Sequence, residues 1–139
     1  MSIEGVPWDF PTKEEVAELH RRELARVGAP EAVVQVDCVD RSIGAAVSAA
    51  LYTSEDDAPD LITAAAHLLV YLAKNHCFTD GNKRAAWFGL VHALALNDLR
   101  VVGSETEAAE LVNGVASGQS SADDVRQWLC YPGRVQEFE

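Results

Sequence analysis

Apolar residues recur at near-helical spacing along most of this sequence, and the first such run follows a polar pair of the kind that begins helices. Thr12 and Glu15 have the spacing of a capping box, in which each side chain bonds the free backbone N–H of the other residue. The apolar positions that follow are Val16, Leu19, Leu24 and Val27. Gly28 and Pro30 then interrupt the pattern. We therefore expect a first helix that begins after Thr12 and ends near Gly28.

The rest of the chain repeats this alternation of amphipathic runs and short polar breaks that carry capping residues. The expected elements, in order, are a short strand or extended loop at 29–39, a second helix from Asp40 or Ser42 to about Leu51, a third at about 59–75, a fourth from Gly81 or Asn82 to about Asn97, an extended piece at 99–102, a fifth helix from Ser104 to about Gly118 and a sixth from Ser120 or Ser121. The third helix is apolar on most faces and should be central and buried. An acidic turn at 53–57 precedes it, and Pro59 suits its first turn. We expect an all-α fold, a compact bundle of about six helices in a single domain, 1–139, with residues 1–11 as an N-terminal arm across the surface.

One polar stretch, HCFTDGNKR from His76 to Arg84, interrupts the apolar pattern between the third and fourth helices. It leads into the N-terminus of a helix, where unpaired backbone N–H groups and the helix dipole attract anions. Gly81 allows the backbone to approach a phosphate closely, and Asn82 can donate from its amide. Lys83 and Arg84 place two cations where the dipole alone would disfavour them. The stretch predicts an anion site, and the alternative is a solvated loop that carries polar residues without a ligand.

Two further side chains in this stretch suit phosphate chemistry. Asp80 supplies a hard oxygen ligand, and Mg²⁺ typically takes one or two carboxylates together with substrate phosphates. His76 can accept a proton near neutral pH, and Phe78 should point into the core.

Outside the stretch, Lys74 is either a source of electrostatic help or a solvated lysine at a helix end. The other histidines are expected in structural places: His20 on the surface of the first helix, and His67 and His92 in the core or a groove.

The composition narrows the class of protein. Eleven Lys and Arg stand against 22 Asp and Glu in 139 residues, a net charge of −11, so binding of nucleic acid through its phosphates is disfavoured. The three cysteines, Cys38, Cys77 and Cys130, form no CxxC pair and are expected as free thiols in a reducing compartment. The N-terminus lacks the pattern of a signal peptide, and the longest apolar run, 61–73, is too short to span a bilayer. We expect a soluble cytoplasmic protein that contacts neither membrane nor nucleic acid directly.

The stretch from His76 to Arg84 resembles the signature of the Fic/Doc family, HxFx(D/E)(G/A)N(G/K)R. The resemblance extends more weakly from about Thr12 to Leu129 and implies the family's helical fold. Lys83 makes the stretch resemble the Doc (death-on-curing) branch, which carries lysine at that position, whereas adenylyltransferase members usually carry glycine. In the Doc branch the lysine is associated with a nucleotide bound in reversed orientation, so that the γ-phosphoryl group is transferred rather than AMP.

The resemblance also implies a role for each matching residue. His76 would be the general base that activates the target hydroxyl, and Asp80 would hold Mg²⁺. The residues implied to bind the phosphates of ATP are Gly81 and Asn82 as donors of an anion nest, Lys83 and Arg84 as cations, and Lys74 as a weaker candidate.

The activity implied by the resemblance is that of a toxin from a type II toxin–antitoxin system. Such a transferase, of the kinase type, uses ATP and Mg²⁺ to phosphorylate a threonine of elongation factor Tu and so inhibits translation. The sequence lacks an (S/T)xxxE(G/N) inhibitory motif, since Thr106 to Glu110 has the spacing but is followed by Leu111, so a separate antitoxin is implied. Two alternatives remain open. Gly81 is shared with protein adenylyltransferases that act on other targets, and the acidic surface would suit a binding module without catalysis.

Overall fold

The computed structural model describes residues 6–53 and 60–138, so the expectations for most of the acidic turn and for Pro59 lie outside the described residues. The expected helical bundle is confirmed, because the described part contains six α-helices and only one small sheet. The helices are α1 (Lys13–Arg26), α2 (Val36–Thr53), α3 (Leu61–Lys74), α4 (Asn82–Ala95), α5 (Glu105–Ala116) and α6 (Ala122–Cys130), and the strands are β1 (Leu99–Val101) and β2 (Val135–Glu137).

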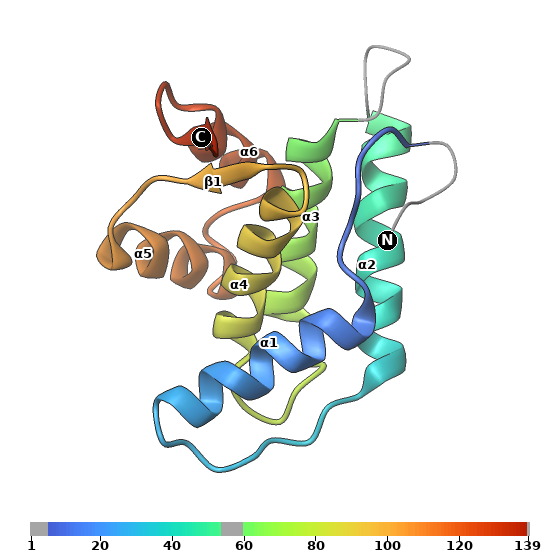
Figure 1. The fold of residues 1–139 in the computed structure, drawn as a ribbon, viewed down its shortest axis with the longest axis vertical. Helices are drawn as coiled ribbons and strands as arrows, with labels where there is room; N and C mark the ends of the chain where they lie inside the picture. The colour runs from blue at the N-terminus through green and yellow to red at the C-terminus, as the bar shows by residue number, and fades with distance from the viewer. Residues whose placement is uncertain (1–5, 54–59, 139) are drawn as a thin grey trace.

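The centre of the molecule is the pair formed by α3 and α4, which pack side by side (Figure 1). Helix α2 flanks α3, α1 lies across α2 and α4 at one end, and α5 and α6 cover the other side of the pair (Figure 1). The residues of α3 that are fully buried are Ala64, Ala65, Ala66, Leu68, Leu69 and Leu72. The expectation of a central, buried third helix is therefore confirmed. Across the described ranges, no helix is both long enough and apolar enough to cross a membrane.

Side-chain caps fix where several helices begin. The Thr12 hydroxyl accepts from the Glu15 N–H at 3.2 Å and the Glu15 carboxylate accepts from the Thr12 N–H at 3.1 Å, which confirms the expected capping box. Ser104 and Glu107 form the same arrangement at the start of α5, and Ser121 forms it at the start of α6. Acidic residues in these first turns are stabilised by the helix dipole.

The segment before α2 and the C-terminal residues differ from what the sequence pattern predicts. Helix α2 begins at Val36 rather than at Asp40 or Ser42, and the Val39 N–H already donates to the Gln35 carbonyl. The extended piece at 99–102 is confirmed as β1, but its antiparallel partner β2 was not expected. A three-residue strand has too few positions to show a period of two, so its pairing could not be seen in the sequence.

The N-terminal segment contributes to the core. Residues 6–11 run without helix along the front of α2 (Figure 1). Phe10 is fully buried, and Asp9 exchanges two hydrogen bonds of 2.9 Å and 2.8 Å with the Asn97 side chain. The described part of the expected surface arm is thus anchored by burial and by hydrogen bonds to the end of α4.

The expectation of three free thiols is wrong for two of them. Cys38 and Cys77 form a disulfide across a separation of 39 residues, with their Cα atoms 5.3 Å apart. Both half-cystines are buried, because α2 packs its first turn against the connection between α3 and α4. Cys130 is a free, exposed cysteine. The spacing of cysteines in a sequence does not reveal which pair the fold brings within bonding distance.

Candidate active site

The polar stretch forms the connection between α3 and α4. Helix α3 ends at its C-cap Asn75, and His76 then adopts the left-handed conformation, with φ of 52°, which turns the chain sharply. The next residues are extended and pair with the segment before α2. The Gln35 N–H donates to the Cys77 carbonyl at 2.8 Å, and the Thr79 N–H donates to the Val33 carbonyl at 3.0 Å. The first half of the connection is therefore fixed by backbone pairing.

Asn82 holds the connection together from its other end. Its side-chain oxygen accepts from the Phe78 N–H at 3.1 Å, and its amide nitrogen donates to the Phe78 carbonyl at 2.9 Å. Phe78 itself is buried, as the sequence predicts. The Asn82 amide nitrogen carries a second N–H that no described residue accepts, so this N–H and the backbone N–H of Asn82 are the donors left for an anion.

The N-terminus of α4 is built unlike those of α1, α3, α5 and α6. Its N-cap, Gly81, has φ of 79° and makes no side-chain hydrogen bond, whereas α1, α3, α5 and α6 each have a side-chain cap. The N–H groups of Asn82, Lys83 and Arg84 have no acceptor within the described residues. The first turn contains no acidic residue and two cations. Such an end has unsatisfied donors and excess positive charge, which an anion would complete.

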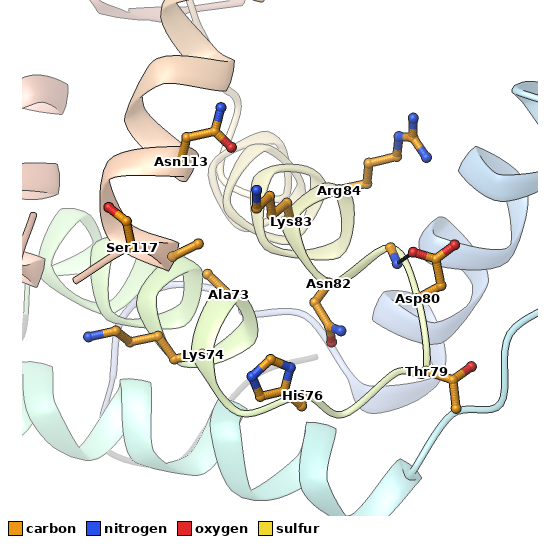
Figure 2. A pocket seen from close by; sticks show the side chains of 12 residues that line it. Ala73, Lys74, His76, Thr79, Asp80, Asn82, Lys83, Arg84, Asn113 and Ser117 are labelled. Carbon is orange, nitrogen blue, oxygen red and sulfur yellow. Dashed lines mark hydrogen bonds between the residues drawn. The ribbon is translucent and has the colours of Figure 1, made fainter. Parts of the chain in front are cut away.

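A cavity of about 870 Å³ opens at this helix end, and every predicted site residue lines it. The predicted residues that it brings together are Lys74, His76, Asp80, Gly81, Asn82, Lys83 and Arg84. In Figure 2, Asp80 and Arg84 lie on one side of the α4 N-terminus, Lys74 lies on the other, and His76 lies below it. The His76 side chain is exposed, and neither ring nitrogen has a hydrogen-bond partner among the described residues.

Helix α5 supplies cavity residues that sequence reasoning missed. Asn113, Ala116 and Ser117 line the cavity, and Asn113 and Ser117 lie on the side of it opposite Asp80 (Figure 2). They recur at positions three and four apart near the end of α5, so they share one face. That face carries small and polar residues where a packed helix would bury apolar ones. This interruption is the signal that could have identified them.

Unpaired cations gather at the cavity although the chain is acidic overall. The arginines that form ion pairs with carboxylates are Arg21, Arg22, Arg26, Arg126 and Arg134. Within the described ranges Lys74, Lys83 and Arg84 form none, and all three side chains are exposed. The charge of Arg84 still reaches Glu23, whose pKa is lowered mainly by its hydrogen bond to Arg26 and further by Arg84. The cavity is therefore a positively charged region on a negatively charged protein.

Among the described residues, Asp80 is the one carboxylate that lines the cavity. One of its oxygens accepts from the Gly81 N–H at 2.8 Å, and the other has no partner among the described residues. No group of three or more His, Cys, Asp or Glu side chains in the described part could hold a metal ion by itself. This arrangement suits a cation that takes one carboxylate oxygen and completes its shell with ligand phosphates and water, as Mg²⁺ does.

Comparison with known proteins places this geometry in a family. The model of the Fic/DOC family matches residues 10–94, which include α1 to α3, the whole connection between α3 and α4, and α4 except its last residue. The protein named Toxin Doc from Mycolicibacterium smegmatis is 36% identical over 72 residues, which cover 50% of this chain and 55% of that protein. The chain therefore spans about half the length of this curated relative. Because the family model covers more than half of the sequence, this chain belongs to the Fic/DOC family.

Proposed function

We propose that this protein is a Doc-like toxin that transfers the γ-phosphoryl group of ATP to a threonine hydroxyl of elongation factor Tu and so inhibits translation. The observation that carries the proposal is the uncapped N-terminus of α4, where Lys83 and Arg84 stand beside the unbonded imidazole of His76. Family membership implies a nucleotide substrate. The name of the relative, Toxin Doc, supports the toxin assignment and the expectation of a separate antitoxin partner.

The nucleotide phosphates would bind at the start of α4. The free N–H groups of Asn82, Lys83 and Arg84 supply donors, and the two cationic side chains supply charge. Asp80 would hold Mg²⁺ through the carboxylate oxygen that Gly81 leaves unpaired. When bound, the ion neutralises phosphate charge and orients the transferred group. Lys74 and Asn113, at the other side of the cavity, face the remainder of the nucleotide.

His76 would accept the proton of the acceptor hydroxyl. Its ring is exposed and unbonded in the described part, so an incoming hydroxyl group can reach a free ring nitrogen. As the hydroxyl oxygen bonds to the γ-phosphorus, the bond from that phosphorus to the bridging oxygen breaks and ADP leaves. The proton lost by the hydroxyl goes to His76. The disulfide and the paired segment 77–79 keep this histidine beside the phosphate site.

Adenylyl transfer to another protein is the second candidate. Lys83 lies at the centre of the cavity in Figure 2, where its side chain takes up space that a glycine would leave for another phosphate. This observation favours γ-phosphoryl transfer. Gly81, which both branches share, keeps the second candidate open. The third possibility, a binding module without catalysis, is motivated by the net charge of −11.

The test uses ATP that is labelled at either the γ- or the α-phosphate, incubated with the purified protein and elongation factor Tu. Label on the factor from the γ-position alone supports the proposal, and label from the α-position indicates adenylyl transfer. His76→Ala should abolish transfer and relieve inhibition of growth on expression. His67→Ala is the control, because the one hydrogen bond that the His67 ring makes within the described ranges is to the Thr63 carbonyl of its own helix, at 2.8 Å. Growth inhibition that persists in His76→Ala would favour the binding module.

A further inference from the structure

His20 is the histidine whose place in the structure differs most from expectation. The sequence predicts it on the surface of the first helix, but only 4% of it is exposed. Its ring stacks on Phe78 with ring centroids 3.8 Å apart and an interplanar angle of 22°. Its Nε2 atom lies 2.7 Å from the carbonyl oxygen of Asp80. A carbonyl can only accept, so Nε2 carries the hydrogen and donates it.

His20 contacts the connection between α3 and α4 on the face that is turned away from the cavity. His20 does not line the 870 Å³ cavity; it lies on the opposite face, in a separate groove of about 490 Å³ between α1 and the segment at 29–34. A Cβ atom added to Gly81 would lie 2.9 Å from His20 Nε2 and 3.2 Å from a Leu24 methyl carbon. The imidazole therefore touches both residues of the Asp80–Gly81 peptide without entering the site.

The Asp80–Gly81 peptide has little other support. Residues 77–79 pair with 33–35, and the Gly81 carbonyl accepts the first hydrogen bond of α4. Among the described residues, the bond from His20 is the one that Asp80 and Gly81 receive from outside the connection and α4. Glycine adopts positive and negative φ with similar ease, so this peptide could rotate at low cost if it were released.

We propose that His20 is a positioning residue, which holds the Asp80–Gly81 peptide so that the Asp80 carboxylate and the α4 N-terminus face the nucleotide together. The expected effect on nucleotide binding rests on the proposed function. The contact between His20 and the Asp80–Gly81 peptide does not depend on it. If the peptide is released, only a fraction of molecules present the binding-competent arrangement. The apparent Kd for nucleotide then equals the intrinsic Kd divided by that fraction, because only molecules in the competent arrangement bind.

Two variants separate the hydrogen bond from the packing. His20→Phe keeps an aromatic ring against Phe78 and removes the donor, whereas His20→Gln keeps an amide donor near Nε2 and removes the stacked ring. The matched control is His67→Phe, since the hydrogen bond of the His67 imidazole in the described part of the chain stays within α3. We expect His20→Phe to raise the KM for ATP about tenfold with a smaller change in kcat, the scale of one buried hydrogen bond. His20→Gln should stay within about threefold of the wild type.

Hydrogen–deuterium exchange of the ligand-free protein gives a readout that needs no activity. We expect the peptide covering residues 76–84 to exchange faster in His20→Phe, and at nearly the wild-type rate in His20→Gln and His67→Phe. Equal exchange in the two His20 variants, or no change in His20→Phe, would overturn the proposal. If the changes in KM and in exchange rate merely parallel the lowering of the thermal midpoint across the variants, His20 has a structural role only and the proposal fails. If the wild type transfers no phosphoryl group, the proposed function fails while the exchange comparison still decides the role of His20.

Discussion

Replacement of Gly81 by alanine tests how closely α1 holds the connection between α3 and α4. Gly81 has φ of 79°, and a non-glycine residue in the left-handed region costs roughly 1–2 kcal/mol. The new Cβ would also lie 2.9 Å from His20 Nε2, so one group must move, which puts the bond from His20 to Asp80 at risk. Loss of that bond and of local packing adds about 1–2 kcal/mol. The variant should therefore lose about 2–4 kcal/mol of unfolding free energy in urea, or roughly 7–14 °C in Tm.

Gly28→Ala is the matched control for this change. Gly28 has φ of 72°, but nothing lies within 4 Å of a Cβ added there. Its replacement should cost only the backbone part, roughly 1–2 kcal/mol. The difference between the two variants then measures the close approach of His20. Equal losses in Gly81→Ala and Gly28→Ala would refute the reasoning that His20 confines this peptide.

Three further outcomes follow from other parts of the structure. Reduction of the Cys38–Cys77 disulfide, whose half-cystines are 39 residues apart, should lower the unfolding free energy in urea by on the order of 4 kcal/mol, and the same reductant should leave a Cys38→Ser variant unchanged. Gly44→Ala should raise Tm by roughly 2–4 °C, because Gly44 is an exposed position inside α2 with open space around it and alanine favours helix; a lower Tm would contradict this. Burial raises the pKa of Glu15, but hydrogen bonds from His92 and Thr12 bring this pKa below its ordinary value of 4.5. The ionised carboxylate therefore stabilises the fold above pH 4.5, and this contribution is lost as the pH falls below 4.5. Thermal midpoints measured as the pH is lowered from about 5 to about 3 should fall more steeply for the wild type than for Glu15→Gln, and equal slopes would exclude the contribution.

Local sequence rules predicted the helices that carry their own caps. Thr12 with Glu15 and Ser104 with Glu107 satisfy each other's backbone donors, and both helices begin where the capping box predicts. The start of α2 was misplaced because no side-chain cap marks it. Its position depends on burial of Cys38 and Val39 against the rest of the fold, which is tertiary information.

The candidate site was predicted unevenly for a similar reason. Residues 76–84 are contiguous, so their polar character stands out in the sequence and all the predicted residues meet in one cavity. His20 and Asn113 reach the same region from distant elements. Within an amphipathic helix, a histidine that bonds a remote carbonyl has the same local pattern as one that faces solvent. The disulfide was missed on the same grounds, since only the packing of α2 brings Cys38 to Cys77.

The pairing of β1 with β2 fixes which end of the molecule suits surface attachment. Strand β1 follows α4, whereas the connection from α3 precedes it, so the two lie at opposite ends of a 14-residue helix (Figure 1). At 1.5 Å per residue that helix is about 21 Å long. Because β2 pairs with β1 in register from Leu99 to Val101, an affinity tag or fluorophore placed beyond β2 emerges well away from the cavity. Immobilisation through that tag leaves the entrance of the cavity accessible from solution.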